Sequence, residues 1–234
     1  MARTYFNFDN LQEGEAVNTE ATRLAREQGL KEIGIGCLMA SARGLSRRAA
    51  QQRQAQARNE LANKAVSLYE KAVTEARQFG TLKVLNVALF TLGRCLRIRN
   101  LGDDRTRALS CFVESLELTQ QTGNVRGQAG AYLDIGETLR MLDRRGEAIT
   151  PLRRSLHLQR RAEYQLGEAE TLEGLIKICW RSHPKRTGVF LERCRAIYRK
   201  PEMHKYNRQW NELERWLEQR KRNEGVKTMP VSSK

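Results

Sequence analysis

The sequence predicts an all-α protein, an α-solenoid of stacked helix-turn-helix units that is closed by a C-terminal helix. The 234 residues include only four Pro and 17 Gly, and the long stretches without either favour helices over a many-stranded sheet. Gly29, Gly80 and Gly123 each follow a helical pattern, which is the usual place for a glycine that ends a helix. Apolar residues recur at helical spacing between these glycines, so paired helices are expected throughout the chain.

The clearest unit begins at Gly127 and consists of two helices separated by a short turn. Large residues at positions i, i+3 and i+7 form one apolar stripe, and a small residue beside it lets the two helices approach closely. Neither helix can bury its stripe alone, so the units are expected to stack. The residues at this spacing are Tyr132, Ile135, Gly136, Leu139, Ala148, Leu152 and Ser155, preceded by a unit with Leu89, Leu92, Gly93, Leu96, Ala108, Phe112 and Ser115.

This spacing resembles the signature of the tetratricopeptide repeat (TPR) family, without a gap over residues 127–162 and more loosely over residues 30–180. It is most similar to the 40-residue variety found in the G-protein-signalling modulator LGN, rapsyn and kinesin light chain. The resemblance implies a right-handed α-solenoid of stacked TPR-like repeats whose first helices line a concave groove. It also implies a protein that holds partners rather than one that catalyses a reaction.

Four parts are expected along the chain. Residues 1–29 hold an N-terminal segment and a lone opening helix, and residues 30–180 form the repeat array. Residues 181–222 form a degenerate fourth repeat and an amphipathic capping helix, and residues 223–234 form a flexible tail.

An insertion at residues 46–64 makes the first repeat unusual. It is rich in Ala, Gln and Arg and lacks Gly and Pro, so it is interpreted as a forward extension of the second helix. A helix that continues to Phe79 would be about 50 Å long at 1.5 Å per residue.

The predicted C-terminal helix carries an aromatic and aliphatic face made of Trp210, Leu213, Trp216 and Leu217. We expect this face to cover the end of the stack, because terminal repeats would otherwise expose an apolar surface. A partner-binding helix is the alternative interpretation.

The net charge is +15, of which residues 181–234 contribute about +9. Such a basic protein is attracted to acidic proteins, nucleic acids and anionic membranes. The plainer alternative is that the surplus Lys and Arg only keep a helical surface in solution.

A cationic groove is the leading candidate site. In the family that the chain resembles, positions one and four residues after the small residue of the first helix face the groove. Transferred by spacing, the cations at these positions are Arg43, Arg94, Arg97, Arg140 and Lys177, and Glu137, Glu173 and Trp180 fall on the same surface. Arg grips a carboxylate with two parallel hydrogen bonds, so the groove is predicted to bind an acidic peptide. The alternative is that these side chains only occupy solvated helix faces.

A secondary basic surface is predicted from Arg47, Arg48, Arg53, Arg58, Arg193, Arg195, Arg199 and Lys200. The first four lie in or beside the insertion, which resembles an arginine-rich RNA-binding helix or a helix that lies against an acidic filament. The others lie in the basic segment Arg181–Arg208, near Tyr198, Tyr206 and Trp210. Basic residues beside aromatic rings can bind single-stranded nucleic acid by charge and stacking.

No catalytic set is evident in the sequence. The three His are far apart, no phosphate-binding loop or nucleophile motif occurs, and no enzyme activity, cofactor or metal is predicted. Five widely spaced Cys indicate a reducing compartment. The N-terminus lacks a secretory h-region and no stretch is long enough to span a bilayer, so a cytoplasmic protein is predicted.

The leading functional hypothesis is a non-enzymatic scaffold that docks acidic protein surfaces or peptides within a larger assembly, with a cytoskeletal or microtubule-associated assembly as one setting. The first alternative is an RNA-associated helical-repeat protein of a ribonucleoprotein. The second is a regulatory TPR protein that senses a peptide or a ligand. The identity of the partner and the oligomeric state stay open.

Overall fold

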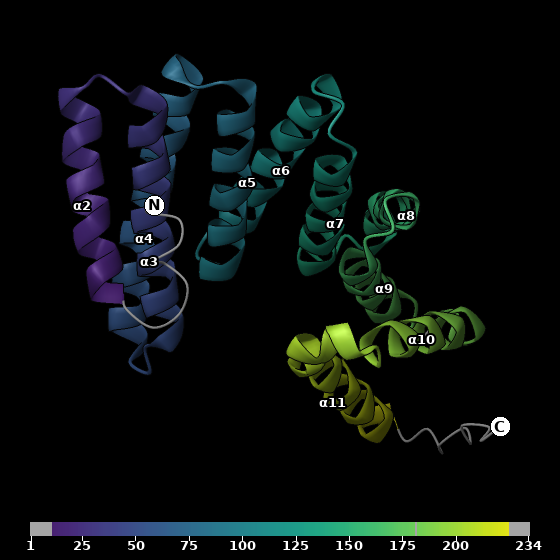
Figure 1. Ribbon diagram of the computed structural model, residues 1–234. Helices are drawn as coiled ribbons and strands as arrows, with labels where there is room; N and C mark the ends of the chain where they lie inside the picture. Colours follow the sequence, from purple (N-terminus) through teal and green to yellow (C-terminus); the bar gives the residue numbers. More distant parts are fainter. Residues whose placement is uncertain (1–10, 181, 225–234) are drawn as a thin grey trace. The chain divides into compact units, whose positions relative to one another are not determined.

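The computed structural model describes residues 11–180 and 182–224, and every regular element in these ranges is a helix (Figure 1). The elements are α2 (Leu11–Glu27), α3 (Lys31–Gln51), α4 (Ala55–Phe79), α5 (Leu82–Arg99), α6 (Asp104–Gln121), α7 (Val125–Met141), α8 (Arg145–Arg161), α9 (Gln165–Cys179), α10 (Pro184–Tyr198), the 3-10 helix η1 (Pro201–Tyr206) and α11 (Asn207–Glu224). The predicted all-α repeat architecture is confirmed. Most of the predicted tail, residues 225–234, lies outside the described residues.

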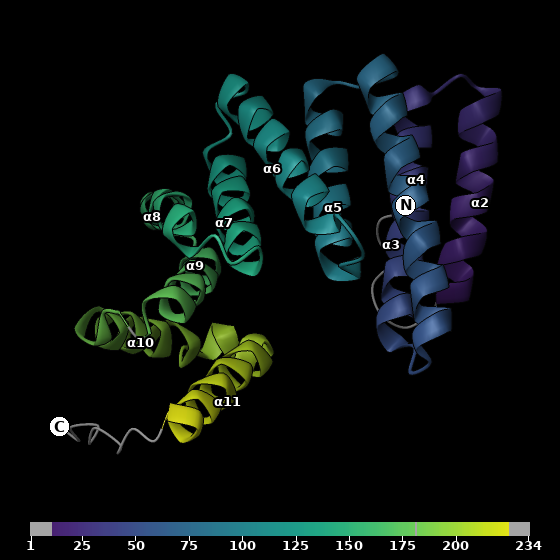
Figure 2. The same ribbon diagram turned by 180° about the vertical axis from the view of Figure 1, so that it is seen from behind.

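The described helices form two compact units, which divide between Leu158 and Gln159. In the N-terminal unit each helix from α2 to α7 packs against the next one along the chain, as the ribbon shows from both sides (Figures 1 and 2). In addition, α3 contacts α5, and α5 contacts α7. The first helices of successive repeats are therefore neighbours, as stacking requires.

The small residue of the repeat signature is needed because the two helices of a pair meet there. A Cβ atom placed on Gly136 would lie 2.5 Å from Cγ of Leu152, and one placed on Gly93 would lie 2.8 Å from Cε1 of Phe112. The buried Ser155 hydroxyl adds a bond across the same interface by donating to the carbonyl of Ala129 at 2.8 Å. The spacing read from the sequence thus marks the contact between α7 and α8.

We expect Gly136→Ala to destabilise the N-terminal unit by about 1–3 kcal/mol, because the new methyl group would overpack the interface with Leu152. Urea unfolding followed by circular dichroism would measure the change. Gly146→Ala is the matched control, since no atom lies within 4 Å of its added Cβ. Equal stability of the two variants would contradict the view that the close contact of Gly136 with Leu152 requires a small residue.

The helix-ending glycines do not all act alike. Gly29 and Gly123 adopt left-handed backbone with φ of 66° and 64°, which confirms their predicted role. Gly80 has φ −95°, so it needs no left-handed conformation. A residue without a side chain is needed at this position, because an added Cβ would lie 2.7 Å from the carbonyl oxygen of Ala76.

The single long helix predicted through the insertion and on to Phe79 is wrong. Residues 46–51 extend α3, residues 55–64 begin α4, and Gln52 and Gln54 between them adopt extended backbone. Ala, Gln and Arg all favour helix, so local propensity carries no signal for this turn. The break instead follows from tertiary structure, since α3 packs against α4.

Two ion pairs join the second helices of successive repeats, α4 and α6. Arg107 pairs with Glu70, and Arg77 pairs with Glu114 at 2.6 Å. Both pairs join residues 37 apart in the sequence. In the first pair α4 supplies the acid, and in the second pair α4 supplies the base.

In the C-terminal unit α10 packs against α9, η1 and α11. Leu213 and Leu217 of α11 are buried, and the ring centroid of Trp210 lies 5.9 Å from that of Tyr198. Trp216 packs edge-to-face on Trp180 at 6.2 Å. The apolar face of α11 is therefore packed within its own unit, and its predicted role as a cap of the whole array stays a prediction.

Candidate partner-binding surface

Arg94, one of the predicted groove cations, belongs to a stripe of side chains along α5. Phe90, Arg94 and Ile98 follow one another at a spacing of four residues and so share one face of the helix. The guanidinium of Arg94 lies over the ring of Phe90, 5.8 Å from its centroid. Ile98 is 79% exposed, more than any other large hydrophobic residue in the described ranges. The stripe therefore presents a cation between an aromatic ring and an aliphatic side chain.

Arg97, also on α5, is held inside the array. Its Nη2 atom lies 2.6 Å from Oδ1 of Asp134 on α7, and its guanidinium covers the ring of Phe112 at 5.5 Å. The side chain of Arg97 is 15% exposed and that of Asp134 is 8% exposed. This pair links the first helices of successive repeats, so Arg97 is not the accessible cation that the spacing predicted.

Two more of the predicted groove cations have carboxylate partners on their own helices. Arg140 pairs with Glu137 at 2.9 Å on α7, and Lys177 pairs with Glu173 at 3.5 Å on α9. Both acids had been placed on the groove surface by spacing, but the pairing itself was not predicted. The helices therefore do not present the predicted line of cations, because several of these cations are neutralised by carboxylates.

Arg43 on α3 is exposed, like Arg94. It lies beside Tyr69, whose pKa is raised by burial, and the charge of Arg43 and a hydrogen bond from it oppose that shift. Of the five predicted cations, Arg43 and Arg94 thus keep charge available at the surface of the N-terminal unit. Lys177 belongs to the C-terminal unit.

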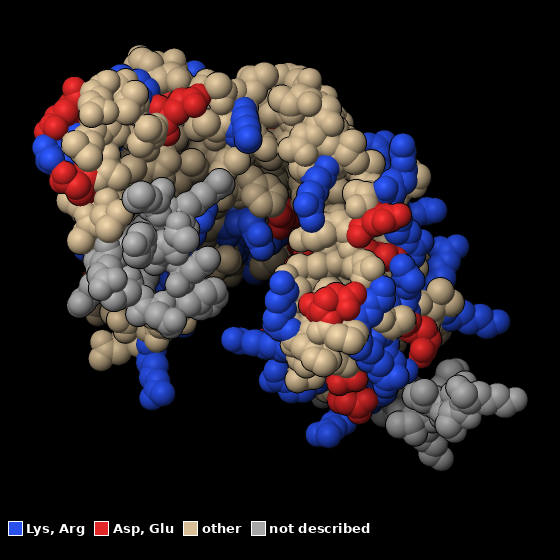
Figure 3. Space-filling view, viewed as in Figure 1, with Lys and Arg blue, Asp and Glu red and all other residues tan. Residues whose placement is uncertain are grey.

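The predicted secondary basic surface divides into two groups in different units. Arg48, Arg53 and Arg58 are exposed around the turn between α3 and α4, and Arg47 beside them is half-buried. The other four lie in the last two turns of α10 or just past its end. They are Arg193, Arg195, Arg199 and Lys200. Figure 3 shows many Lys and Arg side chains, mixed with Asp and Glu, on the C-terminal unit.

Some cations of the group on α10 are engaged in ion pairs within the C-terminal unit. Nε of Arg193 lies 2.9 Å from Oε1 of Glu168, and Arg160 binds the same buried carboxylate at 2.9 Å. Burial opposes ionisation of Glu168, but the hydrogen bonds from these two Arg outweigh it and lower the pKa of the carboxyl. Arg195 pairs with Glu192 at 3.0 Å, and Arg199 is exposed.

Two of the aromatic residues proposed for base stacking are engaged elsewhere. Tyr198 is 2% exposed and donates its hydroxyl to Glu173 at 2.6 Å, and Trp210 packs against the ring of Tyr198. Stacking of bases needs an accessible ring face, which Tyr198 does not offer. Tyr206, the third aromatic residue of the predicted single-strand site, is half-buried.

The cysteine thiols are poor candidates for nucleophiles. Burial raises the pKa of Cys111 to about 11 and also raises the pKa of Cys194, so both thiols are protonated near neutral pH. In the described part of the chain, no group of three or more His, Cys, Asp or Glu is placed to hold a metal ion. Within the same ranges, no helix is sufficiently long and apolar to cross a membrane.

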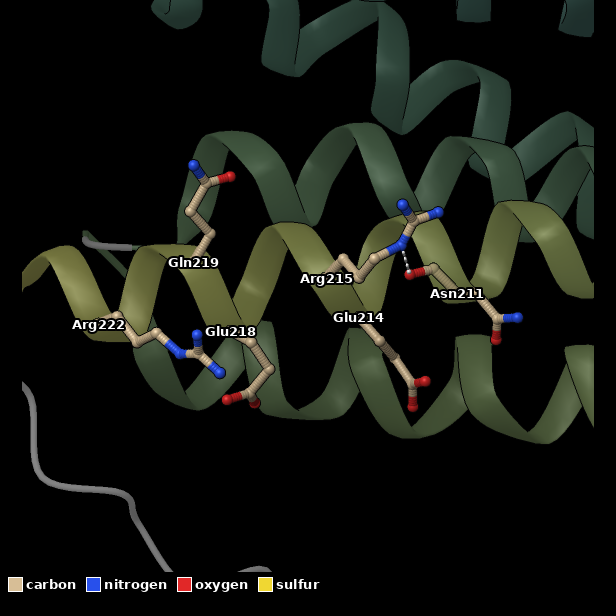
Figure 4. A pocket seen from close by; sticks show the side chains of 6 residues that line it. All are labelled: Asn211, Glu214, Arg215, Glu218, Gln219 and Arg222. Atoms are coloured by element: carbon tan, nitrogen blue, oxygen red, sulfur yellow. Dashed lines mark hydrogen bonds between the residues drawn. The ribbon is translucent and has the colours of Figure 1, made fainter.

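A hollow lies along one face of α11, and all the side chains that line it are polar (Figure 4). Arg215 donates from Nε to the carbonyl of Asn211 at 3.2 Å within this face. The lining carries two acids and two bases, so it offers no net charge to a ligand. The lining residues are Asn211, Glu214, Arg215, Glu218, Gln219 and Arg222.

The helix pairs, the close contacts at the small residues and the stacked first helices together define the TPR-like helical-repeat fold. Among solved structures, the chain is similar to the nearly identical TPR-like repeats of a candidate kinesin light chain from Podosopora anserina. The TM-score is 0.61 at 15% identity, over 84% of this chain and 90% of that one. It is also similar to BtubC (BKLC) from P. vanneervenii, with a TM-score of 0.62 at 15% identity over 97% of each chain. A single-substitution form of the Podosopora anserina repeats gives a TM-score of 0.63 at 14% identity, over 84% of this chain and 91% of that one.

No family model matches the sequence, and no curated protein matches it. At the identities of the solved structures, the likeness describes the fold alone.

Proposed function

We propose that this protein is a non-enzymatic cytoplasmic scaffold that binds an acidic segment of a partner protein along α3 and α5. The observation that carries the proposal is the α5 stripe, in which Arg94 lies between Phe90 and the highly exposed Ile98. Arg43 adds a second exposed cation on the adjoining first helix, α3. A segment that offers carboxylates to the two Arg and an apolar side chain to Ile98 would match this surface.

The paired cations have a different part in this proposal. Arg97 and Arg140 are already bonded to Asp134 and Glu137, so a partner carboxylate would have to compete with those acids. Arg97 sets the spacing and orientation of the first helices α5 and α7, whereas the pair of Arg140 lies within α7. The contribution of charge to binding is therefore assigned to Arg43 and Arg94, which would steer association and fix the register of the bound segment.

The wider setting of the proposal is a cytoskeletal or microtubule-associated assembly. The likeness to repeats named for a kinesin light chain supports this setting, although it reaches only to the fold. The acidic segment would then belong to a filament or to a protein bound to one. The net charge of +15 favours encounters with such acidic surfaces.

The test uses a display library of random peptides, each about 12 residues long, selected on the full chain. We expect enrichment of peptides that combine several Asp or Glu with one large apolar residue. The variant Arg43→Glu/Arg94→Glu should bind the selected peptides at least about tenfold more weakly by fluorescence anisotropy, because each reversal replaces an attraction with a repulsion. Ile98→Ala should weaken them by about 1–2 kcal/mol without altering their dependence on salt.

Arg153→Glu/Arg161→Glu is the matched control, because both are exposed residues of α8, a second helix rather than a first one. Equal helicity of all variants by circular dichroism would establish that the charges and not the fold are tested. Selection of peptides without acidic bias would overturn the proposal. Retention of affinity in the double variant would also overturn it.

A further inference from the structure

The first helix pair of the array is longer than the pairs that follow. α3 has 21 residues and α4 has 25, whereas α5 and α6 have 18 each. The seven additional residues of α4 relative to α6 correspond to about 10 Å of helix. Figures 1 and 2 show, from opposite sides, the turn between α3 and α4 lying beyond the end of α5. We name residues 51–59, which form this projection, the hairpin tip.

The surface of the hairpin tip is made of Arg and side-chain amides. Seven of its nine residues are exposed and polar, and the other two are Ala55 and the half-buried Ala57. It contains no aromatic and no large aliphatic side chain. The exposed polar residues are Gln51, Gln52, Arg53, Gln54, Gln56, Arg58 and Asn59.

The charge of the hairpin tip is not neutralised by ion pairs, unlike that of many other Arg residues in the N-terminal unit. Arg77, Arg97, Arg99, Arg107 and Arg140 each pair with a carboxylate in that unit. Among the described residues, Arg53 and Arg58 have no carboxylate within ion-pair distance. The nearest acid along the chain, Glu60, accepts instead from Nε2 of Gln56 at 3.3 Å.

We propose that the hairpin tip contacts the sugar-phosphate backbone of duplex nucleic acid. Arg and amide side chains are the groups that bond phosphate and sugar oxygens. Affinity from counterion release needs no apolar burial, and the tip has no large apolar group to bury. A protein partner would find no aromatic or aliphatic anchor of the kind that dominates protein interfaces. A single strand would find no ring on which its bases could stack. A duplex backbone is thus the acidic surface that these residues fit best.

The experiment measures fluorescence anisotropy of a labelled RNA duplex of about 20 base pairs, and of the DNA duplex of the same sequence, on the full chain. We expect binding at about 50 mM salt and a steep loss of affinity towards about 200 mM. Arg53→Gln/Arg58→Gln should weaken binding by at least about tenfold at the lower salt. It should also reduce the slope of log affinity against log salt by about two, which is one for each lost phosphate contact.

The matched control is Arg144→Gln/Arg145→Gln, which removes the same charge from two exposed Arg that pair with Glu147 and Asp143. This control should bind within about twofold of the wild-type protein, whereas the tip variant should not. Circular dichroism would confirm equal helicity. Arg43→Glu/Arg94→Glu, the variant that tests the α3–α5 surface, should weaken peptide binding far more than duplex binding.

Binding of either the RNA or the DNA duplex would support the proposal, because both carry the same backbone chemistry. Three results would overturn it: no binding of either duplex at about 50 mM salt, equal binding by the tip variant, or tighter binding of the separated strands. Displacement of the duplex by polyglutamate at equal charge concentration would also overturn it, because the tip would then be a general carboxylate-binding surface.

Discussion

Phe112→Ala should lower the free energy of unfolding of the N-terminal unit by about 3–5 kcal/mol, the largest effect expected for a single substitution in this chain. Phe112 is fully buried and fills the space over Gly93, where an added Cβ would lie 2.8 Å from its ring. Its ring also meets Phe90 edge-to-face at 5.8 Å and lies beneath Arg97. Removing it would leave a cavity under the α5 stripe.

Urea unfolding monitored by circular dichroism would measure this loss, with Val113→Ala as the control. Val113 is the next residue of α6 and is 41% exposed, so its truncation should cost less than about 1 kcal/mol. The Phe112 variant should also bind the selected acidic peptides more weakly, because Phe90 would lose its support. Similar losses of stability in the two variants would show that Phe112 is not the centre of this core.

Asp104→Asn should destabilise the same unit by about 1.5–3 kcal/mol, because it breaks a buried network of charge-assisted hydrogen bonds. The Asp104 carboxylate is 1% exposed and accepts from Nη2 of Arg99 at 2.6 Å and from Nε at 2.8 Å. It also accepts from the backbone N–H of Leu101 at 2.9 Å, which fixes the turn before α6. An amide at this position would turn a donor towards Arg99.

The same network predicts how stability depends on pH. Burial of Asp104 opposes its ionisation, but the bonds from Arg99 and Leu101 and the charge of Arg107 outweigh burial and lower its pKa. The folded pKa is below the unfolded value of about 3.9, so the stabilisation is present above that value and is lost as the pH falls through the folded pKa. Chemical unfolding at a series of pH values should therefore show a steeper acid loss for the wild-type protein than for Asp104→Asn.

Asp103→Asn is the control for this pH series, because Asp103 is the preceding residue and is exposed. Its side chain forms no cap hydrogen bond, so its substitution should cost less stability than that of Asp104. Parallel curves for the wild-type protein and the Asp104 variant would contradict the proposed role of the buried carboxylate.

The fold could be predicted because its determinants are local and periodic. The spacing from Tyr132 to Ser155 records which side chains meet across a helix pair, and the close contact at Gly136 shows why that position is small. The surface was harder to predict, because its charges pair across repeats. Asp134 neutralises the charge of Arg97 although the two residues are 37 apart in the sequence, and only the register of the stacked repeats brings them together.

Two other features also depended on tertiary contacts. The turn at Gln52–Gln54 contains no Gly or Pro. The local sequence therefore does not indicate that the insertion is divided between α3 and α4. Phe90 and Ile98 carry no charge, so the pattern of cations gives no indication of them. Their spacing of four residues on either side of Arg94 was the signal that could have identified them.

The two ion pairs between α4 and α6 have a consequence for how this protein can evolve. Glu70 faces Arg107, and seven residues further along both helices Arg77 faces Glu114. A duplicate of α4 placed after itself would set Glu against Glu and Arg against Arg. α4 and α6 therefore cannot both be copies of one helix, because in these two pairs each carries the charge complement of the other.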